Sequence, residues 1–118
     1  MRITDREFIK NLKGRCENEI KNLNWLTNER RVGMICAYTN VIVFIEDHLQ
    51  TEVINETMAD FKSWLKEHQK GCEEAAYLYG EQGMFDDQNA LEKKSEAFEE
   101  VLEYLNTHII SKEDGNDD

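Results

Sequence analysis

Hydrophobic residues recur every three or four positions along most of this chain, which is the spacing of one face of an α-helix. The first such stripe consists of Phe8, Ile9, Leu12, Cys16, Ile20 and Leu23. Thr4-Asp5-Arg6-Glu7 precedes it and has the form of a capping box, in which Thr4 and Glu7 each accept a hydrogen bond from the other's backbone amide. The pattern therefore predicts a helix over about residues 4–24.

The second stripe lies in the most apolar part of the chain. It follows a candidate cap at Thr27 or Asn28 and consists of Val32, Ile35, Tyr38, Ile42, Ile45 and Leu49. Within it, the β-branched residues of the run at 41–45 favour a strand. We expect a central helix to about Leu49, because the helical spacing persists to that residue. The alternative is a small buried hairpin within residues 32–45, in an α+β fold.

Two further helices are predicted in the second half. One begins at Thr51 or Asn55 and runs to about Lys70, with Ile54, Met58, Phe61, Leu65 and His68 on one face. Gly71 interrupts this helix without necessarily ending it, since residues 72–79 are good helix formers. A loop follows at residues 80–83, where two glycines flank Glu-Gln. The last helix begins at Asp86 or Asp87 and ends near Ile110, with its apolar residues Leu91, Phe98, Val101, Leu102, Leu105 and Ile109 facing inward.

These stripes predict an all-α fold, a compact bundle of four or five helices. The chain has no proline, so its helices can run long without forced breaks. We expect a single helical domain over residues 1–110 and a disordered acidic tail over 111–118. The predicted core contains Ile35, Ile42, Ile45, Phe61, Leu65, Phe98, Leu102 and Leu105.

The sequence predicts a cytoplasmic protein. Charged residues from Arg2 to Glu7 interrupt any secretory signal, and three widely spaced cysteines are typical of reduced thiols. The longest apolar run, at 32–45, is shorter than the ~20 residues that a membrane span needs. We therefore expect no membrane association.

Charge is distributed very unevenly along the chain. Residues 1–45 hold 8 Lys and Arg against 5 Asp and Glu, and residues 46–118 hold 6 against 20, so the net charges of +3 and −14 sum to −11. Basic residues that could contact nucleic acid occur in the first part, at Lys10, Lys13, Arg15, Lys21, Arg30 and Arg31. Direct binding to a duplex is nonetheless disfavoured by the acidic remainder.

The predicted last helix contains the most regular row of acidic residues. Glu92, Glu96, Glu99, Glu100 and Glu103 follow one another at spacings of one to four residues and are predicted to share one face. At ~1.5 Å rise per residue, this face presents a carboxylate about every 6 Å. We predict that these five residues bind a basic partner, in a groove suited to phosphates. The alternative interpretation is a solvated helix face.

The sequence contains no complete motif of an enzyme active site or of a metal site. Glu96-x-x-Glu99 and Glu100-x-x-Glu103 resemble one half of the Mg²⁺ site of the all-α nucleotide pyrophosphatases of the MazG type, but no E-x-x-D follows to supply the other half. His68 and Cys72 lie four residues apart without the close cysteine pairs of a zinc site. No nucleophile motif or phosphate-binding glycine loop occurs. We expect no catalytic residue, no metal and no cofactor.

In its whole-chain character this compact, proline-free, strongly acidic helical domain resembles the small accessory proteins with which bacteriophages block host defences, including anti-CRISPR and DNA-mimic proteins. The resemblance rests on no shared motif and transfers no residue. It implies a non-enzymatic inhibitor that acts in the bacterial cytoplasm on a basic, nucleic-acid-handling host protein such as a CRISPR-Cas or restriction effector. The alternative is a helical structural or adaptor protein acting as a homodimer.

Overall fold

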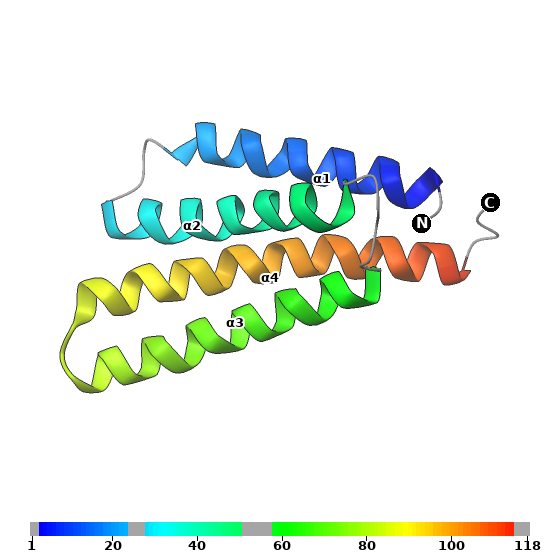
Figure 1. The fold of residues 1–118 in the computed structure, drawn as a ribbon. Helices are drawn as coiled ribbons and strands as arrows, with labels where there is room; N and C mark the ends of the chain where they lie inside the picture. The colour runs from blue at the N-terminus through cyan, green and yellow to red at the C-terminus, as the bar shows by residue number, and fades with distance from the viewer. Residues whose placement is uncertain (1–2, 24–27, 51–57, 115–118) are drawn as a thin grey trace.

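The computed structural model describes residues 3–23, 28–50 and 58–114, and within these it contains four α-helices and no strand (Figure 1). They are α1 (Ile3–Lys21), α2 (Asn28–Phe44), α3 (Met58–Glu81) and α4 (Phe85–Asp114). A π-helical turn, η2 (Ile45–Leu49), continues α2 directly. The predicted all-α bundle is confirmed with four helices. The alternative hairpin within residues 32–45 is wrong, since this stretch is helical without a break.

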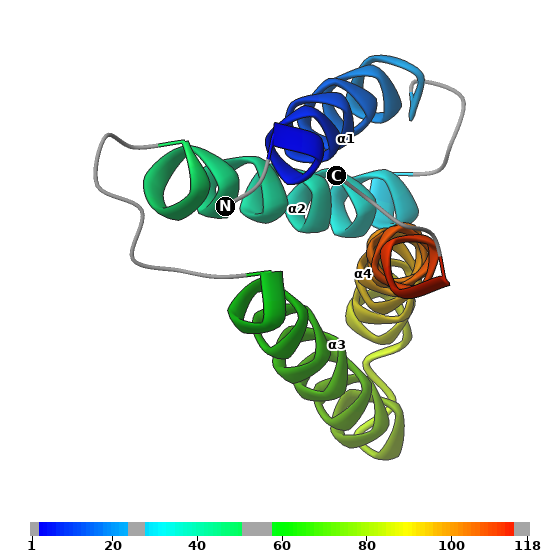
Figure 2. The same ribbon diagram turned by 90° about the vertical axis from the view of Figure 1, so that its right-hand side faces the viewer.

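Helix α4 organises the bundle by packing against both α2 and α3, whereas α1 packs mainly on α2. Figure 2 shows α1 and α3 on opposite sides of the molecule, with α2 and α4 between them. Helices α3 and α4 form an antiparallel hairpin, and α2 runs in the same direction as α4 (Figure 1). This order leaves α1 and α4 as neighbours that share α2 but make little direct contact.

The buried face of α2 differs from the predicted stripe. Val32 is 61% exposed, and the buried positions of the helix are Gly33, Ala37, Tyr38, Val41 and Phe44. The reason is a close approach of two backbones. A Cβ atom added at Gly33 would collide with the carbonyl oxygen of Ala90 and lie 2.9 Å from its carbonyl carbon. Because only glycine allows this contact, α2 turns Gly33 toward α4 and leaves Val32 in solvent.

The β-branched run at 41–45 is helical because tertiary packing overrides its strand preference. Val41 and Ile45 are completely buried. After Phe44 the helix widens into η2, in which the amide of Gln50 donates to the carbonyl oxygen of Ile45 at 2.9 Å. The helix therefore reaches Leu49, as the spacing of apolar residues predicted.

Aromatic side chains join the start of α3 to α2 and α4. The rings of Phe44 and Phe61 stack with their centroids 5.2 Å apart, and Trp64 meets the edge of Phe98 at 5.9 Å. His68 lies over Trp64 at 4.2 Å. Such pairs each contribute about 0.5–1.5 kcal/mol beyond the burial of their area. This end of the hairpin is thus fixed firmly to the rest of the bundle.

Most of the predicted core is buried. Ile45, Phe61, Leu65, Phe98 and Leu105 are fully buried, and Ile35, Ile42 and Leu102 are partly buried against them. The buried set also includes Ile9, Leu12, Cys16 and Leu23 from the first predicted stripe. Apolar spacing therefore predicted which residues contribute to the core, although it did not predict which of them are fully buried.

The turn between α3 and α4 is a Schellman motif. Gly83 has a φ of +75°, its amide donates to Gly80 at 3.2 Å, and the amide of Met84 donates to Tyr79 at 2.9 Å. This pattern satisfies the last carbonyls of a helix and favours glycine at the residue with positive φ. The predicted loop is confirmed in place, although α3 continues through Gly71 and Gly80 to Glu81.

Helix boundaries differ from the predictions by a few residues. Helix α1 begins at Ile3, so Thr4 lies inside the helix rather than at its cap; its side chain lies outside the described part. Helix α4 continues to Asp114, so the first four residues of the predicted disordered tail are helical. The candidate caps at Thr27, Thr51 and Asn55 and residues 115–118 lie outside the described residues.

Among the described residues, one helical segment is long and apolar enough to cross a membrane. It is Asn28–Leu49, with 22 residues and a mean hydropathy of 1.3 over its best window. It is longer than the apolar run identified in the sequence because polar residues flank that run within the same helix. In the bundle this segment is the helix on which α1 and α4 pack, and the core helix of a soluble protein meets the same criteria.

Candidate functional site

Four of the five predicted binding residues form one exposed row on α4. Glu92, Glu96, Glu99 and Glu103 are all exposed, and we call them the acidic ridge. The opposite face of the same helix holds buried Phe98, Val101 and Leu105. Glu103 lies eleven positions after Glu92, so a rise of about 1.5 Å per residue gives a mean spacing of about 5.5 Å between neighbouring residues of the ridge.

Little positive charge accompanies this ridge. The Nζ atom of Lys93 lies 2.8 Å from the carboxylate of Glu96, an i,i+3 pair on the helix surface. Lys94 points elsewhere, toward a small hollow of about 340 Å³ that it lines with Cys72 and Leu91. The ridge therefore keeps most of its charge.

Glu100, the fifth predicted residue, is half-buried and lies beside the exposed row of the ridge. Its carboxylate accepts hydrogen bonds from the hydroxyls of Tyr38 at 3.0 Å and Tyr104 at 3.2 Å. Burial, together with the charge of Glu100, raises the pKa of Tyr38, which keeps that hydroxyl protonated as a donor. The guanidinium of Arg15 lies 4.1 Å above the ring of Tyr104. Glu100 thus links α4 to α2 through Tyr38. That Glu100 also contacts a partner stays a prediction.

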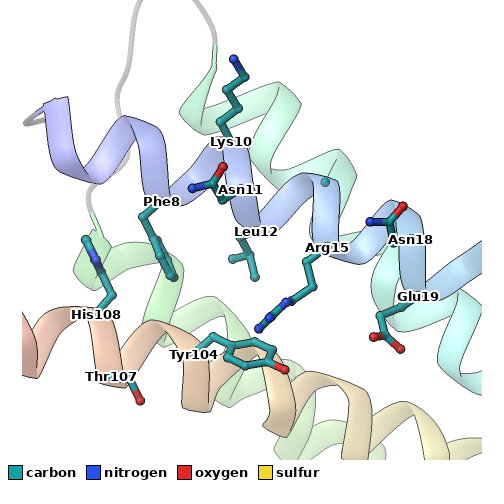
Figure 3. A pocket seen from close by; sticks show the side chains of 11 residues that line it. Phe8, Lys10, Asn11, Leu12, Arg15, Asn18, Glu19, Tyr104, Thr107 and His108 are labelled. Atoms are coloured by element: carbon teal, nitrogen blue, oxygen red, sulfur yellow. The ribbon is translucent and has the colours of Figure 1, made fainter.

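An open groove of about 1060 Å³ lies between α1 and α4 (Figure 3). Its walls combine Phe8 and Leu12 with Tyr104 and polar side chains of both helices. His108 stacks on Phe8 at 4.2 Å, and its Nε2 lies 2.8 Å from the carboxylate of Asp5. Through these contacts, and through the guanidinium of Arg15 over the ring of Tyr104, α1 and α4 are joined across the groove.

The candidate metal ligands do not converge. His68 Nδ1 lies 2.9 Å from the backbone carbonyl of Trp64, and Cys72 is buried. Burial raises the pKa of the Cys72 thiol, whereas a metal ligand must be a thiolate. Within the three described stretches, no group of three or more His, Cys, Asp or Glu side chains is placed to hold a metal ion.

One surface feature escaped the sequence analysis. Four of the six exposed large hydrophobic side chains among the described residues lie at the α3–α4 turn, and we call them the tip patch: Tyr77, Leu78, Met84 and Phe85. The signal was present, because Tyr77 and Leu78 fall off the stripe that includes Phe61, Leu65 and Cys72.

The groove also escaped the sequence analysis, since it depends on how far α1 stands from α4. No apolar spacing within either helix reports that separation. Comparison with known proteins gives no further guidance, because no protein-family model, no curated protein and no solved structure matches this chain.

Proposed function

We propose that this protein is a non-enzymatic inhibitor that binds a basic, nucleic-acid-binding surface of a host effector, such as a CRISPR-Cas or restriction protein, through the acidic ridge of α4. The observation that supports this proposal is the ridge itself, in which Glu92, Glu96, Glu99 and Glu103 are exposed in one line on a 30-residue helix. A rigid row of carboxylates offers negative charge at regular intervals, as a nucleic-acid strand does.

The ridge is better explained by binding than by helix stability. Like charges at i,i+4 spacing destabilise an isolated helix by a few tenths of a kcal/mol per pair. Only Glu96 has a lysine partner within the described residues of the helix. Opposite charge on a partner would offset the repulsion and accelerate association by electrostatic steering.

A homodimeric adaptor is the second candidate, and a separate observation favours it. Val32 and Val43 are both exposed and lie eleven residues apart, which places them on the same side of α2. In that case the negative charge of the chain serves solubility, and association depends on apolar contact across α2.

The first test reverses the charge of the ridge. The variant Glu96→Lys, Glu99→Lys and Glu103→Lys should lose binding while keeping its fold, since exposed substitutions usually change stability by less than ~0.5 kcal/mol each. Binding is measured as recovery of host proteins from bacterial lysate on the immobilised protein, eluted by a salt gradient. A recovered effector is then assayed as purified protein, where the wild type should block its access to DNA.

The matched control reverses three exposed carboxylates elsewhere, Glu7→Lys, Glu17→Lys and Asp47→Lys. It changes the net charge equally and should retain binding, because only the position of the charge differs. Equal binding by the two triple variants and the wild type, unaffected by salt, would eliminate the ridge as an interface. Loss of self-association in Val32→Ser with Val43→Ser, seen by sedimentation, would instead favour the adaptor.

A further inference from the structure

We infer that the tip of the α3–α4 hairpin is a docking surface for a basic amphipathic segment of a partner protein, with the tip patch as its apolar anchor. This inference rests on the proposed function, because it assumes the same basic partner. It adds that apolar side chains of this partner contact the tip patch, at a different place from the ridge.

The first support is that the apolar side chains of the tip patch are exposed and are not part of the core. Tyr77 is 65% exposed, Leu78 56%, Met84 42% and Phe85 63%. All four belong to the end of α3, the turn and the start of α4, at the left of Figure 1. Tyr77 and Leu78, with Glu73 and Glu74, line a shallow hollow of about 400 Å³. Exposed aromatic residues gathered at one place are typical of interaction sites.

The second support is the charge around this patch. No lysine or arginine occurs between Lys70 and Lys93, and the interval holds six acidic residues. Five of them surround the tip patch and are exposed: Glu73, Glu74, Glu81, Asp86 and Asp87. None of these five forms an ion pair in the part of the chain that the structure describes.

Helix stability explains only part of this acidity. Asp86 and Asp87 lie in the first turn of α4, where negative charge is favourable. Glu81 is the last residue of α3, and a carboxylate at a helix C-terminus is opposed by the helix dipole. Glu73 accepts only long hydrogen bonds, from Ser95 at 3.4 Å and Gln69 at 3.5 Å. The charge at Glu81 and Glu74 thus has no evident role in the fold.

Charge complementarity selects the occupant. An acidic surface repels nucleic acid and anionic membranes, and two tips of this chain would repel each other. Arg30 and Arg31, at the start of α2 on the same end of the molecule (Figure 1), form no ion pair with the tip carboxylates among the described residues. A helix with lysine or arginine on one side and apolar residues on the other would satisfy both parts of the tip.

The turn is built to hold this surface in shape. The Schellman hydrogen bonds of Gly83 and Met84 fix the relation of α3 to α4. The tip patch is therefore presented by a rigid turn, which lowers the entropic cost of binding.

The test uses a synthetic helix of leucine and lysine, with its leucines at helical spacing, and a scrambled peptide of the same composition. In the wild-type protein, NMR shift changes on addition of the helical peptide should concentrate at residues 73–87. The variant Tyr77→Ser, Leu78→Ser and Phe85→Ser should weaken binding by about tenfold or more, and Gln50→Ser, a change at an exposed residue after η2, should leave it unchanged.

The outcomes separate this inference from the proposed function. Unchanged affinity of the tip variant, shift changes confined to the ridge, or equal binding of the scrambled peptide would overturn the docking surface. Binding to phosphatidylserine vesicles in place of the peptide would overturn it in favour of a lipid surface. If the tip variant binds the helical peptide as the wild type does while the ridge reversal does not, the proposed function is kept and the docking surface at the tip is rejected. If the tip variant does not bind the helical peptide while the ridge reversal does, the docking surface at the tip is supported and the proposed role of the ridge is rejected.

Discussion

Two adjacent glutamates on α4 have opposite roles. Glu99 is exposed on the acidic ridge, whereas Glu100 accepts hydrogen bonds from Tyr38 and Tyr104. One position along a helix is a rotation of about 100°, which is enough to move a side chain from solvent to the boundary of the core. The chemistry of the residue type does not distinguish the two.

This contrast gives a residue-scale prediction. Glu100→Ala should lower the free energy of unfolding by about 1–3 kcal/mol, because the buried hydroxyl of Tyr38 loses its acceptor. Glu99→Ala should stay within ~0.5 kcal/mol of the wild type. Urea unfolding of the two variants decides the point, and equal stabilities would contradict the role assigned to Glu100.

At the scale of the elements, the tightest contact is between two backbones. Gly33 on α2 meets the carbonyl of Ala90 on α4, so these helices approach more closely than side chains would allow. Gly71 on α3 has no atom within 4 Å of an added Cβ, so the same substitution there meets open space.

Alanine at the two glycines should therefore act in opposite directions. Gly33→Ala should destabilise the protein by about 1–3 kcal/mol or more, because α2 and α4 must separate. Gly71→Ala should raise stability by up to about 1 kcal/mol, since alanine is the better helix former. Thermal unfolding monitored by circular dichroism measures both, and a stabilised Gly33→Ala would show that the helices pack less closely than described.

The apolar spacing within each element was sufficient to predict the all-α class, the four helices and buried residues such as Phe61 and Phe98. The spacing did not predict the environment of residues whose burial or contacts depend on a second helix. The turning of Gly33 inward and Val32 outward depends on the backbone of α4, and the hydrogen bond that Glu100 accepts depends on Tyr38 of α2. The acidic ridge was predictable because it depends only on positions within one helix.

At the scale of the whole molecule, buried ionisable groups lower the stability of the fold at high pH. Burial raises the pKa of the Cys16 thiol from 9.0 to about 12. Burial also raises the pKa of Tyr38 above its ordinary 10.0. In both cases the unfolded chain releases its proton at a lower pH than the folded protein does, so the folded state loses its advantage as pH rises.

We therefore expect full stability below pH 9.0 and a decline toward about pH 12, with Cys16 contributing a slope of up to about 1.4 kcal/mol per pH unit. Urea unfolding across this range should show a shallower decline in Cys16→Ala, although that variant is less stable at neutral pH because it leaves a cavity. Parallel declines in the two proteins would exclude Cys16 as a source of the alkaline loss.

The central position of α4 also has a consequence in time. Helix α4 follows α1, α2 and α3 along the chain, yet it covers both α2 and α3. At about 5–20 residues per second, the buried segment from Ala97 to Leu105 follows the end of η2 by several seconds, on the order of 3–10. During that interval α2, the most apolar of the described helices, lacks the cover of α4 and has only α1 and the start of α3 to pack against. The nascent protein is thus most exposed to aggregation, or to capture by chaperones and membranes, before α4 emerges from the ribosome.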